Sequence, residues 1–236
     1  MPTPPVAPVL DVIVPAYNEA DRVAGTVSSL RACPSVARVI VVDDASRDGT
    51  SEAARAAGAE VIAVAGRRRK GGAMAAGLGV ASARFVAFID ADLAGTAALV
   101  GELAAPVLAG DADLSIAKFE FAGGLRGFGW VLRLSRWAVR RYCGLRLDNP
   151  LCGQRAMPRD VAARLLPFGP GFAVETRMTI VAGRLGLRLV EVPLAMDHRR
   201  SGRDLQGILH RAAQFKDVLL ETLRWALGLA ARGREV

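Results

Sequence analysis

The sequence has few of the residues that build disulfide frameworks, zinc sites or histidine-based catalytic centres. Its three cysteines, Cys33, Cys143 and Cys152, have no spacing typical of a disulfide framework or a metal site. Its two histidines, His198 and His210, form no recognisable metal-ligand or Ser-His-Asp pattern. We therefore expect a reduced, cytoplasmic setting and a chemistry that depends on other side chains.

Long hydrophobic runs are also missing. No uninterrupted apolar stretch reaches the length of about 18 residues that a membrane-spanning helix needs. The first ten residues, MPTPPVAPVL, have no basic region followed by an apolar core, so they do not resemble a signal peptide. These absences predict a protein that is soluble, or that lies on the inner face of a membrane without crossing it.

Lysine is scarce, although the chain has a net charge of +8. Only Lys70, Lys118 and Lys216 are lysines, and the remaining basic residues are arginines, which bind phosphate oxygens in bidentate geometry. The surplus fits phosphorylated small molecules, nucleic acid or an anionic membrane as partner. A GC-rich genome would give the same bias, and no nucleic-acid-binding module is recognisable.

The first half of the chain alternates between apolar strands and amphipathic helices. The strands are continuous apolar runs, as in a sheet that is covered on both faces. Strand–helix alternation predicts an α/β fold with a mostly parallel, doubly wound sheet flanked by helices. We expect strands over 9–17, 37–44, 59–65 and 84–90, and helices over 19–32, 50–58 and 72–83.

From about residue 119 the composition changes, because six arginines and no acidic residue lie between Phe121 and Leu147. A helix is expected over 128–142, with Val131, Leu132, Ala138, Val139 and Tyr142 on one side. Its other side carries Trp130, Arg133, Arg136, Trp137, Arg140 and Arg141. Further along we expect a helix over 174–186, a strand over 187–196 and an amphipathic helical tail over 205–236.

Asp90 and Asp92 follow a buried strand with one alanine between them. Two neighbouring carboxylates repel each other unless a positive charge offsets the repulsion. A divalent cation such as Mg²⁺ does this, and it often binds through one or two carboxylates together with substrate phosphates. The pattern therefore predicts a metal site if a phosphate-bearing substrate lies near, and an ordinary solvated loop if none does.

The segment GRRRKGGA, residues 66–73, follows the third expected strand. Its glycines allow backbone amides to approach a phosphate, and its cations attract one. It is not a GxxxxGK[ST] loop, because no Lys-Ser/Thr pair follows the glycines. A solvated basic turn is the competing interpretation.

The Arg/Trp side of the helix over 128–142 has three interpretations: an exposed face, a site for an acceptor phosphate, or a surface that lies on anionic lipid. Tryptophan and arginine together favour an interface over simple solvation.

Six segments occur in an order typical of one family. They are VIVPAYNEADRV, VIVVDDASRDGT, KGGAMAAGL, FIDADL, CGQRAM and EVPLAMDHR. Together they resemble the family-2 glycosyltransferases of GT-A fold, and within them the polyprenyl-phosphate (dolichyl-phosphate mannose or glucose synthase-like) sugar transferases. The resemblance covers residues 9 to about 203. It implies a single GT-A domain over 1–236, with a nucleotide-sugar-binding half (1–118), an acceptor-binding half (119–204) and a C-terminal helical tail (205–236).

The resemblance also implies roles for individual residues. The nucleotide-binding positions are Pro15, Ala16, Tyr17, Glu19, Asp43, Asp44, Lys70, Gly71, Asp90 and Ala91. Asp90 and Asp92 match the DxD motif and would hold Mg²⁺ or Mn²⁺. The acceptor-phosphate positions are Lys118, Arg133, Ser135, Arg199 and Arg203. Asp148 and Glu175 match two further acids of the family. Asp92, Asp148 and Glu175 form the catalytic set.

The chain departs from the family pattern at three places. Ala94 stands where some members carry a glutamine after the DxD motif. The later GxSK element is replaced by Gly202-Arg203-Asp204, and the GFRA turn by Gly153-Gln154-Arg155-Ala156.

The reaction implied is inverting transfer of a sugar from a UDP- or GDP-linked donor to a polyprenyl phosphate at the membrane surface. A phosphate acceptor is already anionic at neutral pH, so it needs arginines for positioning and no strong base. A hydroxyl acceptor on a soluble substrate is the alternative, with Asp148 or Glu175 as general base. A nucleotidyltransferase is disfavoured because VPAYNEADRV has no Gly-rich loop, and a catalytically silent nucleotide-binding protein is the remaining alternative.

Overall fold

The protein is described by a computed structural model that covers residues 9–119, 129–169, 171–196 and 205–230. Arg199 and Arg203, two of the predicted acceptor residues, lie outside these ranges. The strands are β1 (Leu10–Ala16), β2 (Val36–Asp43), β3 (Glu60–Ala63), β4 (Phe85–Phe88), β5 (Leu114–Phe119), β6 (Arg155–Pro158) and β7 (Leu189–Leu194).

Helices separate most of these strands. They are α1 (Val23–Arg31), α2 (Thr50–Ala56), α3 (Arg69–Val80), α4 (Val100–Leu108), α5 (Gly129–Cys143), α6 (Arg159–Arg164), α7 (Val174–Arg184) and α8 (Leu205–Ala226), with short 3₁₀ helices η1 (Ala94–Leu99) and η2 (Gly171–Ala173).

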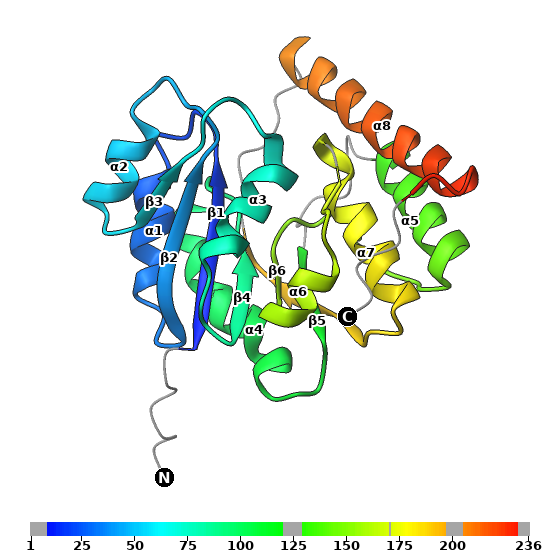
Figure 1. Ribbon diagram of the computed structural model, residues 1–236, viewed down its shortest axis with the longest axis horizontal. Coiled ribbons are helices and arrows are strands. Elements are labelled where there is room, and N and C mark those ends of the chain that lie inside the picture. Colours follow the sequence, from blue (N-terminus) through cyan, green and yellow to red (C-terminus); the bar gives the residue numbers. More distant parts are fainter. Residues whose placement is uncertain (1–8, 120–128, 170, 197–204, 231–236) are drawn as a thin grey trace.

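The described strands form one seven-stranded sheet in the order β3-β2-β1-β4-β6-β5-β7 (Figure 1). Strands β1 to β4 are mutually parallel, and β5 is parallel to β7. Only β6 runs antiparallel to its described neighbours, β4 and β5. The prediction of a mostly parallel α/β sheet is therefore confirmed.

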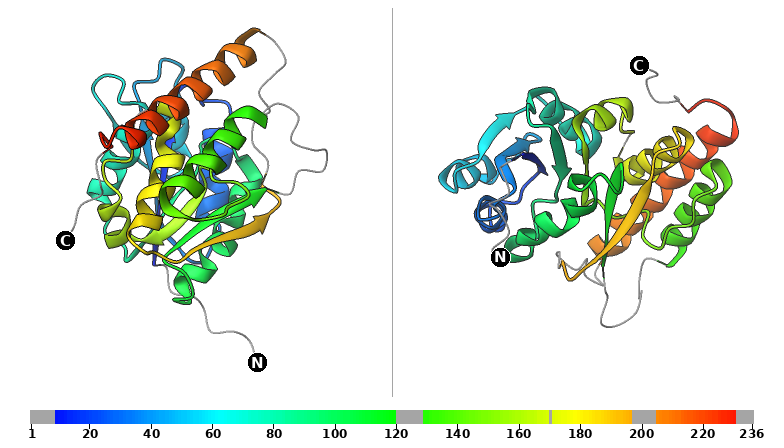
Figure 2. Two further views of the ribbon diagram at one scale, coloured as in Figure 1. Left: turned by 90° about the vertical axis from the view of Figure 1, so that its right-hand side faces the viewer. Right: turned by 90° about the horizontal axis from the view of Figure 1, so that it is seen from below.

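Helices cover both faces of the sheet: α1 and α4 lie on one face, and α3 and α6 on the other (Figure 2). Strands β1 and β4 are almost entirely buried, as is β2 from Val39 onward, with Ile13, Val41 and Phe88 exposed by 1% or less. Burial on both faces explains why these strands are continuous apolar runs rather than alternating sequences.

Helix α3 begins at Arg69, earlier than the expected start at residue 72. The cause is Asp44, which follows β2 and accepts hydrogen bonds from the backbone N–H groups of Arg68 (2.6 Å) and Arg69 (2.9 Å). A carboxylate at a helix N-terminus satisfies donors that have no partner within the helix. Lys70 consequently lies in the first turn of α3 and not in a loop.

Helices α5, α7 and α8 form a layer beside the β5–β7 end of the sheet (Figure 1). Helix α8 is held there by the buried ion pair of Arg177 and Glu221 (2.8 Å), and by Asp217, which accepts a hydrogen bond from the Phe172 N–H (3.0 Å). Within the described ranges, none of the helices combines the length and hydropathy required to cross a bilayer.

Candidate functional site

The connections that follow β1, β2, β3 and β4, called the strained loops below, share an unusual backbone feature. Each has a non-glycine residue with positive φ, either within the loop or at the first residue of the next helix: Asn18 (54°), Ala45 (63°), Arg69 (59°) and Ala94 (46°). Such conformations cost free energy and persist where the surrounding structure fixes them, often at functional sites. In a parallel sheet these loops meet at one edge, which is where ligands bind in open α/β folds. The candidate site is at this edge.

At its centre Lys70 bridges two carboxylates. The Lys70 Nζ lies 2.6 Å from Asp90 Oδ1 and 2.8 Å from Glu175 Oε1, although these residues come from α3, the end of β4 and the first turn of α7. Burial alone would lower the pKa of Lys70, but the charges of Asp90 and Glu175 outweigh it and raise the pKa. The ammonium group therefore stays charged and offsets the negative charge of the DxD region.

Gln154 completes this arrangement, and sequence reasoning missed its contact. Its Nε2 donates a hydrogen bond to Asp90 Oδ2 (2.7 Å), and its Oε1 accepts one from the Cys152 thiol (3.0 Å). Burial raises the pKa of Cys152 to about 12, so the thiol remains a donor. The only available signal was the departure at GQRA, because the antiparallel pairing of β6 with β4 leaves no periodic pattern in so short a strand.

Gly153 is required by the same packing. A Cβ atom at this position would lie 2.5 Å from Lys70 Nζ and 2.8 Å from Asp90 Oδ2. Gly71 is required for a different reason, since its Cβ would lie 2.3 Å from the carbonyl oxygen of Gly169. Gly71 thus sets the distance between α3 and the backbone of Gly169.

The two predicted nucleotide-binding acids at the end of β2, Asp43 and Asp44, are buried and hold their loop through hydrogen bonds. Asp43 accepts hydrogen bonds from the Ser46 N–H (2.8 Å) and from the Ser51 hydroxyl. Asp44 caps α3, as described above. Tyr17 lies nearby, with the Arg67 guanidinium 3.5 Å above its ring. Pro15 and Ala16 end β1, and the Glu19 N–H donates to the Thr50 hydroxyl (2.9 Å).

The DxD loop is fixed through its backbone. Thr26 donates to the carbonyl oxygen of Ala91 (2.7 Å), and Arg22 donates to that of Asp92 (2.9 Å). The side chains of Asp90 and Asp92 are both partly exposed. No group of three or more His, Cys, Asp and Glu residues gathers as a metal site in the described ranges. Two carboxylates fit Mg²⁺ or Mn²⁺ if diphosphate oxygens complete the coordination.

Lys118 and Asp148 form a second polar cluster at the adjoining part of the edge. Lys118 Nζ lies 2.5 Å from Asp148 Oδ2, and Arg136 of α5 donates to the Asp148 carbonyl oxygen (2.8 Å from Nε). The hydrogen bond and charge of Lys118 lower the pKa of Asp148. Glu191 of β7 accepts the Asp148 N–H (2.7 Å). The cluster presents cations from two elements, and Asp148 is a weak proton acceptor.

Ser135 lies in the packed interior between α5 and α7 and not at the Lys118–Asp148 cluster, which corrects the expectation that it contacts an acceptor. Its side chain is fully buried and hydrogen-bonded to the Thr176 hydroxyl (2.8 Å). It is four residues from Val131 and three from Ala138, both buried, so it belongs to the packed side of α5. Arg133, on the opposite side, is exposed and lies over the Trp130 ring (5.5 Å).

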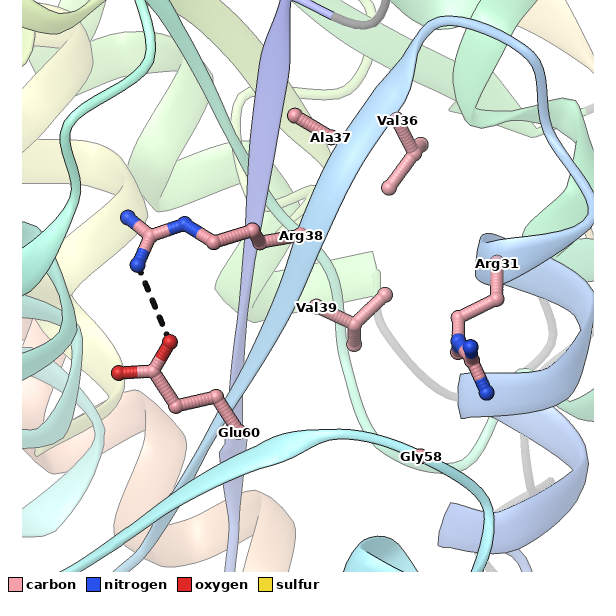
Figure 3. A pocket seen from close by; sticks show the side chains of 7 residues that line it. All are labelled: Arg31, Val36, Ala37, Arg38, Val39, Gly58 and Glu60. Atoms are coloured by element: carbon pink, nitrogen blue, oxygen red, sulfur yellow. Dashed lines mark hydrogen bonds and ion pairs between the residues drawn. The ribbon is translucent and has the colours of Figure 1, made fainter.

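A cavity of about 320 Å³ lies away from the candidate site, at the amino end of β2. It is lined by Arg31, Arg38, Gly58 and Glu60 among others (Figure 3). Arg38 is already paired with Asp11 (2.7 Å) and Glu60 (3.0 Å). The cavity lies at the opposite edge from the strained loops and contains no DxD residue.

Comparisons with known proteins identify the family of the chain. Residues 11–162 match the family model "Glycosyl transferase family 2". An undecaprenyl-phosphate mannosyltransferase of Micrococcus luteus is 32% identical over 93% of this chain and 94% of its own length. A polyprenol monophosphomannose synthase of Mycolicibacterium smegmatis is 32% identical over 87% of this chain and 84% of its own.

A solved structure extends the likeness to three dimensions. Glucosyl-3-phosphoglycerate synthase from Mycobacterium tuberculosis, in complex with Mn²⁺, UDP and glucosyl-3-phosphoglycerate, superposes with a TM-score of 0.77 at 29% identity. The match covers 97% of this chain and 83% of that one. With the family model spanning more than half of the residues and the structural match covering 97% of the chain, the chain belongs to glycosyltransferase family 2, has the GT-A fold and is a sugar-transferring enzyme.

Proposed function

We propose that this enzyme transfers a sugar, with inversion, from a UDP- or GDP-linked donor to a polyprenyl phosphate at the surface of a membrane. The relatives from M. luteus and M. smegmatis act, by their names, on lipid phosphates. Their likeness extends through the acceptor half of the chain, which supports a shared class of acceptor.

The donor would bind at the strained loops. Pro15, Ala16, Tyr17 and Glu19 after β1, and the Asp43–Asp44 corner after β2, would surround the nucleoside, while Gly71 and Ala91 keep the backbone close. Lys70 supplies a permanent positive charge beside Asp90, where the diphosphate would lie. Bound at Asp90 and Asp92, Mg²⁺ or Mn²⁺ would neutralise the negative charge that develops on the leaving diphosphate.

The acceptor would bind at the Lys118–Asp148 cluster. A phosphate monoester has a second pKa of about 6 and needs no general base at neutral pH. The lowered pKa of Asp148 makes this acid a poor base, and Glu175 forms an ion pair with Lys70; both observations fit an acceptor that is already anionic. Lys118 and Arg133 would position it, and Arg199 and Arg203 remain proposed contributors.

The observation that carries the choice of a lipid acceptor is the surface of α5 and α8, which lie side by side (Figures 1 and 2). Of the large apolar side chains that are exposed in the described chain, all but Val80 lie on these helices or in the turn after α8. They are Trp130, Trp137, Phe215, Leu219, Leu220, Leu223, Leu227 and Leu229. Exposed apolar groups concentrated in this way mark an interaction surface.

The charges on these two helices favour an anionic membrane as the partner. Arg133, Arg140 and Arg141 of α5 and Lys216 and Arg224 of α8 are exposed. The acids of α8 turn inward, because Glu221 is buried against Arg177 and Asp217 binds the Phe172 N–H. Basic residues interleaved with tryptophan and leucine are typical of helices that lie in the headgroup region of anionic bilayers.

A water-soluble acceptor is the second candidate. It is favoured by the solved glucosyl-3-phosphoglycerate synthase structures, which include a complex with phosphoglyceric acid. Such an acceptor is also anionic, so the Lys118 cluster alone does not distinguish it from a lipid phosphate.

The test is label transfer. The protein is incubated with Mg²⁺ or Mn²⁺, undecaprenyl phosphate and labelled UDP- and GDP-sugars in turn, and the products are extracted into organic solvent. We expect label in the organic phase with wild-type protein and a loss of at least a hundredfold with Asp92→Asn, because the developing charge loses its main counterion.

Two other outcomes would redirect the assignment. Donor hydrolysis that depends on Asp92, with no labelled lipid, would favour the soluble acceptor. An absence of both signals with every donor would favour a silent nucleotide-binding protein. Circular dichroism of Asp92→Asn serves as the control for folding.

A further inference from the structure

We propose that Gln154 is a positioning residue for Asp90, and that the Cys152 thiol sets the orientation of the Gln154 amide. Together they would fix the first DxD carboxylate before the donor and its metal bind. The inference rests on the proposed function, because it concerns the site where the nucleotide–metal complex would lie.

The sheet brings the two side chains together. In the antiparallel pairing of β4 with β6, Phe88 is opposite Arg155. Gln154 precedes Arg155, and Asp90 follows Phe88 by two residues, so both leave the paired strands at the same edge. Gln154 is 1% exposed, and its amide is confined between the Cys152 thiol and Asp90.

Both carboxylate oxygens of Asp90 are then held by donors from the protein. Lys70 binds Oδ1 at 2.6 Å, and Gln154 binds Oδ2 at 2.7 Å. These donors come from different elements, so the carboxyl plane is fixed from two directions. Each oxygen retains a further lone pair that can bind a cation.

The thiol determines which end of the amide faces Asp90. The Cys152 thiol donates to the side-chain oxygen Oε1 of Gln154, so the NH₂ group of the same amide faces the Asp90 carboxylate. The reversed amide would place its carbonyl oxygen against Asp90, and two acceptors would then face each other without a proton between them. A hydrocarbon side chain at position 154 could fill the space but could not hold Asp90.

The experiment measures binding and not turnover. Mn²⁺ affinity is titrated by calorimetry in the presence of UDP and of GDP in turn. The variants are Gln154→Met, which keeps the length of the side chain without its donor, and the pair Cys152→Ser and Cys152→Ala. Cys143→Ser and Cys143→Ala are matched controls, because Cys143 is partly buried and donates to the Val139 carbonyl oxygen instead.

We expect Gln154→Met to weaken Mn²⁺–nucleotide binding roughly tenfold or more, the usual effect of losing a hydrogen bond to a charged group. Cys152→Ala should weaken it several-fold, and Cys152→Ser should restore most of the loss because a hydroxyl also donates. The Cys143 variants should bind like wild type.

A packing role would give the opposite order at position 152, since a serine hydroxyl without a hydrogen-bond partner is less favourable than alanine in a buried apolar site. Serine that binds no better than alanine, or Gln154→Met that binds like wild type, would overturn the inference while leaving the proposed function intact. Wild-type protein that binds neither nucleotide with Mn²⁺ would overturn both. If Gln154→Met does not fold, the comparison of Cys152→Ser with Cys152→Ala still tests the inference.

Discussion

At the residue scale, the candidate site depends on the absence of a side chain as much as on the charged groups. Gly153 lies against Lys70 and Asp90 with no room for a methyl group. The side chains of Lys70 and Asp90 cannot shift without losing contacts, because Lys70 is also bound to Glu175 and Asp90 to Gln154.

Gly153→Ala should therefore lower sugar transfer at least tenfold, because the new Cβ separates Lys70 from Asp90. We expect the free energy of unfolding to fall by about 1–3 kcal/mol, as for other overpacked interiors. Gly79→Ala is the control, since its Cβ would meet nothing within 4 Å. Transfer by Gly153→Ala at the wild-type rate would mean that the Lys70–Asp90 contact is not needed.

A second residue, Asp11, should determine part of the acid stability of the fold. Burial alone would raise its pKa, but hydrogen bonds from Arg38 and from the Ala83 and Ser82 N–H groups outweigh burial and lower it. A lowered pKa in the folded state contributes stability above the unfolded value of about 3.9, and this stability is lost as the pH falls through the folded pKa.

Urea unfolding of wild type and Asp11→Asn across pH 2–7 tests this. We expect wild type to be the more stable by roughly 2–4 kcal/mol at pH 7, because the variant leaves Arg38 without its buried partner. The difference should shrink below about pH 4, where the carboxylate in the unfolded chain takes up protons while the native carboxylate, with its lowered pKa, still resists protonation. A gap that is independent of pH would contradict the assignment.

At the element scale, the strained loops store backbone strain that the hydrogen bonds around them maintain. Ala45 has φ of 63° between β2 and α2, a region that costs an L-residue about 1–2 kcal/mol. Its neighbours Asp43 and Asp44 are both fixed by hydrogen bonds, so the loop cannot relax.

Ala45→Gly should raise the free energy of unfolding by about 0.5–1 kcal/mol, since the relief of strain exceeds the entropy cost of glycine. Ala75→Gly in the middle of α3 is the matched control and should lower it by about 1 kcal/mol. Thermal unfolding distinguishes the two. A loss of stability in both variants would mean that the Ala45 conformation carries no strain.

How far the sequence predicts the structure also differs between elements. The alternation of strands and helices up to residue 90 was predictable because each strand is a continuous apolar run, and the two sides of α5 followed from helical periodicity. The short strand β6 was not, because its four residues include a fully buried arginine, Arg155, whose partners Cys152 O and Pro150 O lie in an irregular loop.

The candidate site also contains residues that the sequence predicted and residues that it did not. The motif residues Lys70, Asp90 and Glu175 do meet in space, although their spacing in the sequence says nothing of the contact. Gln154 was noticed only as a departure from the family pattern. The burial of Ser135 could have been predicted, since Val131, Leu132 and Ala138 place it on the apolar side of α5.

At the scale of the whole molecule, α5 joins the proposed membrane surface to the Lys118–Asp148 cluster, the proposed acceptor cluster. Arg136 on this helix binds the Asp148 carbonyl oxygen, while Trp130 and Trp137 are 77% and 53% exposed. The same helix thus contacts the acceptor cluster and presents apolar groups outward.

Sedimentation with phosphatidylglycerol vesicles tests this surface. We expect the wild-type protein to bind, and the double variant Trp130→Glu/Leu227→Glu to bind at least tenfold more weakly, because each change places a negative charge where an apolar side chain would enter the headgroup region. Raising the salt concentration should weaken wild-type binding.

Val80→Glu is the matched control, since Val80 is the large exposed apolar residue away from this surface. Equal losses in the control and in the double variant, or equal binding to vesicles of phosphatidylcholine, would contradict the proposed orientation.

The reversed direction of β6 bears on how such an enzyme can change over evolution. Because β6 runs against β4, the stretch between α5 and β6, residues 144–154, arrives at the edge where the donor loops end. This stretch carries Asp148 and Gln154, and it lies outside both helix α5 and strand β6. In the proposed arrangement, mutations or insertions confined to its first half would alter which acceptor is used while the proposed donor loops keep their sequence. New acceptor specificities would then arise by exchanging one short segment.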